Sequence, residues 1–142
     1  MQKANGNDLP SVMDAVEKTR STIERICAEV WQEAELSKEE VKSSQIHIRE
    51  LEAAGFAITS RGTSGYPTAF VAEWRQGEGG ARLGFLPEYD ALPNLGNAPV
   101  SEQAPRSDNR TSGHGCGHNL LGAGCTGAAI ALKRLMAQDS VA

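Results

Sequence analysis

A long stretch without hydrophobic periodicity, residues 93–113, divides the chain into two unequal ordered parts. It consists of Pro, Asn, Ser, Gly and single charges, and it is longer than the ~12–15 residues that structureless loops in compact domains usually reach. We therefore predict a functional or a disordered loop here. An Ala-, Gly- and Leu-rich helix is predicted after it, over Asn119–Ala137, where small residues such as Gly122 would permit close packing against a sheet.

Two amphipathic helices are predicted before the loop. From about Ser11 to Trp31, apolar residues recur every three or four positions, a spacing that places them on one side of a helix. Ser37 and Glu40 have the spacing of a capping box, which predicts the start of a second helix. Gly55 offers that helix a C-terminal stop. His47 falls in the second helix, where we expect it to be solvated.

Three short strands are predicted next. Phe56–Ser60 is short, Thr68–Trp74 alternates apolar with small polar residues, and Arg82–Leu86 is apolar ahead of Pro87. Gly77–Gly80 would form the hairpin turn between the last two strands. A three-stranded sheet with one covering helix leaves an edge and a face uncovered. The order of elements therefore indicates an α/β fold that is unfinished at residue 142.

Composition limits the classes of function. The chain of 142 residues fits one compact domain at most. Its formal charge is −4 and its 14 basic residues are scattered, which argues against nucleic-acid binding. Residues 1–10 form a polar tail, and nowhere do 18 apolar residues run together, so signals for secretion and membrane spanning are both missing. Three irregularly spaced cysteines suit a reducing compartment, and we expect a cytoplasmic location.

The densest group of potential metal ligands is His114-Gly115-Cys116-Gly117-His118, directly before the last helix. The two glycines let the backbone fold tightly enough for sulfur and imidazole to point at one centre, and the helix N-terminus favours the thiolate of Cys116. A thiolate and a neutral imidazole suit Zn²⁺ or a similar divalent ion. The alternative is a Gly-rich turn with incidental histidines and a half-buried cysteine.

Glu88 and Asp90 follow the third predicted strand, with Tyr89 between them. If the extended backbone continues past Pro87, both carboxylates point to the same side. They then lie at the strand end where open α/β sheets build their sites. One could bind a metal while the other orients an imidazole. The alternative is an exposed acidic turn.

Together, these segments resemble the N-terminal part of the M20 family of metallo-aminohydrolases and peptidases, within its group of aminobenzoyl-glutamate hydrolase-like and aminoacylase-1-like proteins. The resemblance rests on Pro87–Pro93 and Gly113–Gly122, and it extends over roughly Val12–Leu135. It implies that residues 11–142 form the N-terminal portion of a three-layer α/β catalytic domain of the zinc-exopeptidase type. Two helices, about three strands, a long loop and a helix make up that portion.

The resemblance also implies roles for individual residues. Cys116 matches a thiolate that bridges two divalent ions, with Zn, Mn, Co and Ni as the candidate metals, and His118 matches a terminal ligand. Asp90 matches the catalytic-site carboxylate that orients a ligand, and Glu88 stands where other branches of the family have a ligand histidine. Two further residues would contact the ligands without binding the metal themselves: His114 and Asn119.

The activity that the resemblance implies is metal-dependent hydrolysis of the amide bond of N-acyl or N-aroyl amino acids, with an aminobenzoyl-glutamate-like compound as the favoured substrate. No nucleic acid or membrane partner is expected, and the full-length form would be a homodimer or a hetero-oligomer. The chain departs from the family at Ala34, which often is Pro, and it ends at Ala142, before the family's general base and later ligands. We expect the 142-residue chain alone to bind divalent metal weakly and to be inactive.

Three other interpretations compete with this one. Gly122–Gly127 fits the dinucleotide fingerprint G-x-G-x-x-G by letter, but it follows a loop where the fingerprint requires a strand. Cys116 could be the nucleophile of a thiol hydrolase with His114 or His118 as its base, although residues two apart rarely meet as a dyad. A non-catalytic truncated fragment or interaction module would explain the missing base.

Overall fold

The computed structural model describes residues 9–139 of the chain. The helices are α1 (Leu9–Glu17), α2 (Arg20–Glu33), α3 (Val41–Ala53) and α4 (His118–Asp139), and the strands are β1 (Ala57–Arg61) and β2 (Phe70–Glu73). Helix α1 already includes Leu9 and Pro10, which we predicted as the end of the polar tail, and the rest of that tail lies outside the described residues. The fold is mixed α/β, as predicted.

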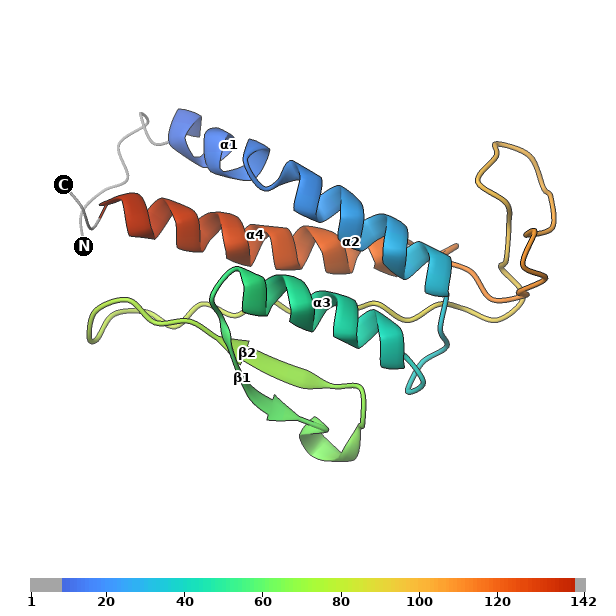
Figure 1. Ribbon diagram of the computed structural model, residues 1–142, viewed down its shortest axis with the longest axis horizontal. Coiled ribbons are helices and arrows are strands. Elements are labelled where there is room, and N and C mark those ends of the chain that lie inside the picture. Colours follow the sequence, from blue (N-terminus) through green and yellow to red (C-terminus); the bar gives the residue numbers. More distant parts are fainter. Residues whose placement is uncertain (1–8, 140–142) are drawn as a thin grey trace.

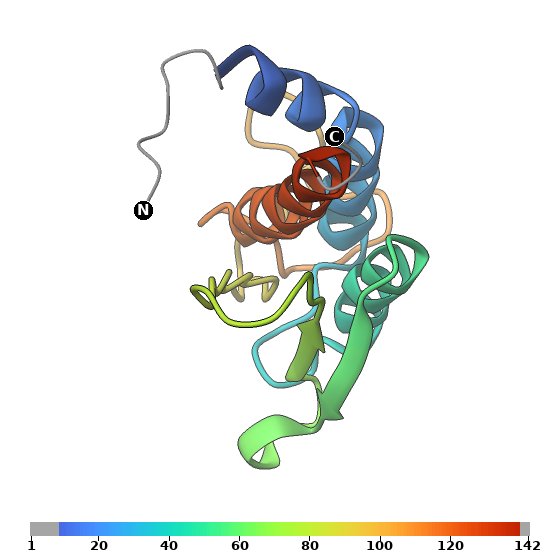
Figure 2. The same cartoon turned by 90° about the vertical axis from the view of Figure 1, so that its left-hand side faces the viewer.

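Helix α4 lies at the centre of the arrangement. In the view of Figure 1, α1 and α2 lie above α4 and α3 lies below it, with the β1–β2 hairpin next to α3. The turned view in Figure 2 shows α2 and α3 next to each other, and α2 packs against both α3 and α4. The core between the helices contains Ile26 and Val30 of α2, Ile46 of α3 and Ala123 of α4. Burial of these apolar surfaces joins the three helices, at roughly 1.5–3 kcal/mol for each large side chain.

The first predicted helix is two helices in the structure, because the backbone breaks between Glu17 and Arg20. Thr19 is fully buried at this break, and its hydroxyl donates to the carbonyl oxygen of Ala15 at 2.9 Å. Such a side-chain bond to the preceding turn competes with regular helix geometry. The hydroxyl also accepts from the guanidinium of Arg134, at the far end of α4. Ser11, the predicted start of the first helix, lies inside α1, which begins at Leu9.

Helix α3 begins differently from the prediction. The carboxylate of Glu35 accepts from the backbone N–H groups of Lys42 and Ser43, at 3.0 and 2.8 Å. It therefore caps the helix from outside the predicted capping box. Glu40 has no capping bond to the helix, and its Oε2 instead accepts from the Thr68 hydroxyl. The predicted stop at Gly55 is confirmed, since α3 ends at Ala53 and Gly55, which follows the C-cap Ala54, has a φ of +81°.

Two of the three predicted strands form, and they pair antiparallel with each other. The predicted third strand, Arg82–Leu86, is not a strand, and Leu83 and Leu86 are 67% and 79% exposed. A strand needs a partner for its backbone groups, and none of the residues in 9–139 pairs with this segment. The turn over residues 77–80 therefore does not close a hairpin, and among residues 9–139 each of the two strands has only the other as a strand partner.

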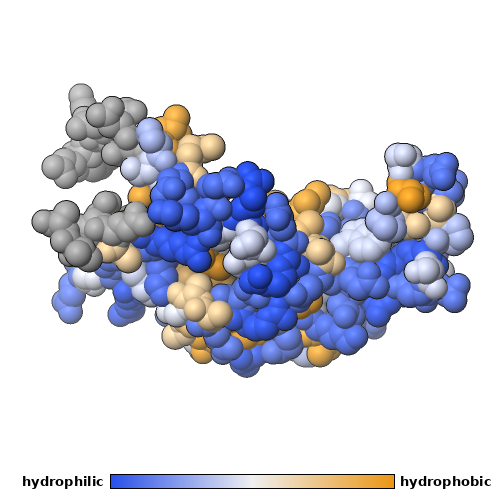
Figure 3. Space-filling view, turned by 45° about the horizontal axis from the view of Figure 1, so that its top comes forward, coloured by the Kyte–Doolittle hydropathy of each residue, from blue (hydrophilic) through white to orange (hydrophobic). Residues whose placement is uncertain are grey.

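The long loop is folded back on itself. Leu92 and Gly113 exchange two backbone hydrogen bonds of 3.0 Å at its base, and the N–H of Gly96 donates to Thr111 at 2.7 Å. On the face shown in Figure 3, hydrophilic residues predominate and apolar residues form separate small areas. Within the described part of the chain, His118–Ala137 is one helix that could cross a membrane by length and composition. A core helix meets the same criterion, and α4 packs against α1, α2 and α3.

Candidate metal centre

The candidate centre lies where the start of α4 meets the extended segment that precedes the long loop. His118 is the first residue of α4, and the chain enters the helix through a tight turn in which the Gly117 N–H donates to His114 at 3.0 Å. Gly117 has a φ of +82°, a conformation that favours glycine. The segment with Glu88 and Asp90 is fixed just beyond them, because the Ala91 N–H donates to Glu35 at 2.7 Å.

The imidazole of His118 lies between two carboxylates. Its Nδ1 is 2.7 Å from Oδ1 of Asp90, and its Nε2 is 3.0 Å from Oε2 of Glu88. The side chains of His118 and Asp90 are 21% and 24% exposed, whereas that of Glu88 is 55% exposed. The histidine is therefore held from the inner side by Asp90 and opens toward solvent on the side of Glu88.

These three side chains form a group that could hold a divalent metal ion. One ligand atom from each can be chosen so that all lie within 4.8 Å of one another. Since a carboxylate only accepts hydrogen bonds, Nδ1–H of His118 donates to Asp90, and in a neutral ring Nε2 then offers a lone pair. Two acceptors 3.0 Å apart need a proton or a cation between them. Two ligand atoms of one tetrahedral Zn²⁺ lie roughly 3.3 Å apart, which is close to the observed separation.

Tyr89 anchors the segment on the side opposite the carboxylates. Its hydroxyl donates to the carbonyl oxygen of Thr68 at 2.7 Å. Burial, together with the charges of Glu40 and Asp90, raises the pKa of Tyr89 to about 12. The alternation predicted from the extended backbone is thus present, with Glu88 and Asp90 toward His118 and the ring of Tyr89 toward the interior.

The other predicted site residues lie around this group. Cys116 is exposed and is not a member of the three-residue group found in residues 9–139. His114 has its Nε2 3.1 Å from the carbonyl oxygen of Val30, and burial lowers its pKa. The amide of Asn119 donates to the sulfur of Cys27 at 3.2 Å. His114 and Asn119 thus connect the turn and the start of α4 to helix α2, and the ligand role of Cys116 stays a prediction.

His47 is a functional candidate that the sequence analysis placed wrongly. It is fully buried, whereas we expected a solvated position in the second helix. Its Nδ1 lies 2.8 Å from the hydroxyl oxygen of Thr126 in α4. Desolvation lowers its pKa to about 4. One feature of the sequence could have predicted this burial: His47 lies four residues before the apolar Leu51, which is buried, so both residues are on the inner side of α3.

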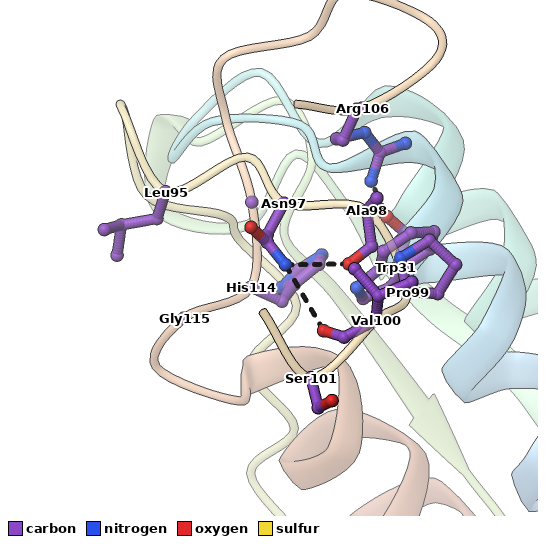
Figure 4. Close-up of a pocket in the computed structure, with 11 residues that line it drawn as sticks. Trp31, Leu95, Asn97, Ala98, Pro99, Val100, Ser101, Arg106, His114 and Gly115 are labelled. Carbon is purple, nitrogen blue, oxygen red and sulfur yellow. Dashed lines mark hydrogen bonds between the residues drawn. The ribbon is translucent and has the colours of Figure 1, made fainter. Parts of the chain in front are cut away.

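A pocket of about 470 Å³ opens beside the turn that leads to Cys116. Its walls come from the long loop, from Trp31 in α2 and from His114 and Gly115. Figure 4 shows the amide of Asn97 reaching the carbonyl oxygens of Ala98 and Val100, bonds that shape the loop around the pocket. The guanidinium of Arg106 lies 4.4 Å above the Trp31 ring. The pocket thus presents both apolar and hydrogen-bonding surface.

The mixed α/β fold and the histidine between two carboxylates agree with the class of protein that the sequence resembles, and the chain belongs to the M20 family. Over 88% of its length it is 38% identical to a subunit of p-aminobenzoyl-glutamate hydrolase of Escherichia coli (strain K12). It is 34% identical to Xaa-Arg dipeptidase of Mus musculus over 90% of its length, and 32% identical to Xaa-Arg dipeptidase of Homo sapiens over 84%. No protein-family model matches the chain. The chain spans about a quarter of the length of these curated relatives.

Proposed function

We propose that the chain is part of a metal-dependent hydrolase that cleaves the amide bond of N-acyl or N-aroyl amino acids. One observation carries the proposal: the imidazole of His118 faces Glu88 through Nε2 and is held by Asp90 through Nδ1. Hydrolase and dipeptidase relatives at 32–38% identity support it.

The residues of the chain would act on the metal as ligands and as supports for ligands. Asp90 accepts a hydrogen bond from Nδ1–H of His118, which fixes the tautomer and makes the Nε2 lone pair a stronger donor to a cation. Glu88 would contribute a carboxylate oxygen from the solvent side, and Cys116 would contribute its thiolate from the preceding turn. When bound, a divalent ion supplies a Lewis acid that polarises the amide carbonyl.

The favoured substrate is an aminobenzoyl-glutamate-like compound. The p-aminobenzoyl-glutamate hydrolase relative is 38% identical to this chain, against 32–34% for the two dipeptidases. The pocket beside Gly115 also offers the indole of Trp31 and the side chain of Val100, surfaces that suit an aromatic or acyl group. This relative is named as one subunit of its enzyme, which is compatible with our expectation that the full-length protein assembles with itself or with a second chain.

Elemental analysis of the full-length protein tests the metal centre. We expect bound divalent metal in the wild type and reduced occupancy in His118→Ala, Cys116→Ala and Glu88→Ala. Glu39→Ala removes an exposed carboxylate outside the centre and is the matched control. Full occupancy in both His118→Ala and Cys116→Ala would contradict the assignment.

Hydrolysis assays test the substrate class. The full-length wild type should release the amine from aminobenzoyl-glutamate faster than from simple N-acyl amino acids, and a chelator should abolish the release. Release that persists in chelator but is lost on alkylation with iodoacetamide would contradict metal-dependent hydrolysis and favour a thiol hydrolase with Cys116 as its nucleophile.

A further inference from the structure

His47 contacts both segments that form the candidate metal centre, helix α4 and the segment that carries Glu88 and Asp90. Its Nδ1 lies 2.8 Å from the hydroxyl oxygen of Thr126, which belongs to α4, the helix that begins with His118. Its ring lies 5.1 Å from the ring of Tyr89, centroid to centroid, at an angle of 32°. Tyr89 stands between Glu88 and Asp90 in the chain. His47 therefore contacts the same two segments that His118 connects through its ring nitrogens.

The side of α4 that faces this contact has a regular spacing. His118, Gly122 and Thr126 are four residues apart, so they lie on one side of the helix. Gly122 has no side chain there, and an added methyl group would overlap the carbonyl oxygen of Glu88 and lie 3.1 Å from Cε1 of His47. The helix, the carboxylate segment and the His47 ring thus meet around Gly122 without free space.

Packing alone does not account for a histidine at this position. The second ring nitrogen of His47, Nε2, is buried and has no hydrogen-bond partner among residues 9–139. A buried nitrogen without a partner is unfavourable, and a phenyl ring would fill the same space without that cost. The hydrogen bond from the ring to Thr126 is the feature that a phenyl ring could not provide.

We propose that His47 is a positioning residue for the metal centre. Its hydrogen bond to Thr126 and its contact with Tyr89 set the distance between α4 and the segment that carries Glu88 and Asp90. That distance determines how the two carboxylates meet the His118 ring. The inference rests on the proposed function, because it requires that these side chains bind a metal ion.

Cobalt binding by the full-length protein tests the inference, with Co²⁺ affinity measured by chelator competition and site geometry by the visible absorption of bound Co²⁺. His47→Phe retains the ring contact and loses the hydrogen bond, and Thr126→Val removes the hydroxyl at constant shape. We expect each to weaken Co²⁺ binding roughly ten-fold, the lower bound for residues that orient metal ligands, and to change the cobalt spectrum. Thr22→Val makes the same change at a half-buried threonine of α2 and should leave both unchanged.

Two further comparisons make the outcome decisive. The double variant His47→Phe/Thr126→Val should lose no more affinity than either single variant, because both remove the same bond. His47→Asn keeps a hydrogen-bonding atom near the position of Nδ1 and should retain more affinity than His47→Phe. Thermal unfolding of the metal-free variants verifies that each is folded.

Wild-type affinity and spectrum in both His47→Phe and Thr126→Val would overturn the inference while leaving the proposed function intact. A wild-type protein that binds no Co²⁺ would overturn both. These two failures are distinguished by the wild-type measurement alone.

Discussion

Acidification should destabilise the protein through His47. Desolvation lowers the pKa of this buried ring from 6.5 to about 4, and the neighbours that face it are the hydroxyl of Thr126 and the ring of Tyr89. In the unfolded chain the same group titrates near its ordinary pKa. Between these two values the unfolded state binds a proton that the folded state does not. Folding stability is therefore fully present above about pH 6.5 and is lost as the pH falls toward 4.

The size of the effect follows from the separation of the two pKa values. Each unit of difference corresponds to about 1.4 kcal/mol. The free energy of unfolding should thus fall by about 2 kcal/mol between neutral pH and pH 5, and by about 3 kcal/mol at pH 4. A loss of this size is a large part of the ~5–15 kcal/mol that usually stabilises a domain.

Urea unfolding followed by far-ultraviolet circular dichroism measures the loss. Wild type and His47→Asn should be compared at about pH 7.5 and pH 5. Burial also lowers the pKa of His114, but this contribution is common to both proteins and cancels in the comparison. The wild type should lose about 2 kcal/mol more than the variant on acidification. Equal losses would refute the reasoning, because they would mean that His47 is protonated in the folded protein as readily as in the unfolded one.

Three further predictions use the same unfolding assay. Gly122→Ala should lower the free energy of unfolding by about 1–3 kcal/mol, because the added methyl group overlaps neighbouring atoms. At Gly124 an added methyl group meets nothing within 4 Å, so Gly124→Ala should be neutral or stabilise by up to about 1 kcal/mol. Similar effects at both positions would be inconsistent with the close approach at Gly122. Arg106→Met should lower the free energy of unfolding by about 3 kcal/mol, because the nearly buried guanidinium of Arg106 donates to Asp108 and to two carbonyl oxygens of α2. A neutral result would show that these bonds contribute little. Glu35→Gln should lower the free energy of unfolding by about 1 kcal/mol, because it weakens the cap of α3. The same substitution at an exposed neighbour, Glu39→Gln, should change nothing. An equal loss in both variants would contradict the capping role of Glu35.

Local patterns in the sequence predicted much of the fold. The small-residue helix after the loop, the stop at Gly55 and the first two strands depend on neighbouring residues, and all are present. The break between α1 and α2 lies at Thr19, whose hydroxyl bonds to Ala15 and also to Arg134, more than a hundred residues away, and no local pattern contains the second contact. The third strand failed for a related reason, because a strand is completed by a partner and not by its own composition.

The candidate site was predictable in part. Residue types and the family resemblance selected Glu88, Asp90 and His118, and the structure brings these three together, while their role as ligands stays a prediction. The burial of His47 was not predicted because a histidine in an amphipathic helix is usually interpreted as a solvent-exposed residue. Only the fold shows that α4 and the segment around Tyr89 enclose it.

The four-residue spacing of His118, Gly122 and Thr126 determines where the gene can change in length. One residue inserted between His118 and Thr126 would turn the remainder of α4 by about 100° and carry the threonine away from α3. Residues added at the tip of the loop lie beyond the backbone bonds that join Leu92 to Gly113, so the two segments of the centre would keep their places. Insertions should be accommodated in the loop and excluded from the first two turns of the helix.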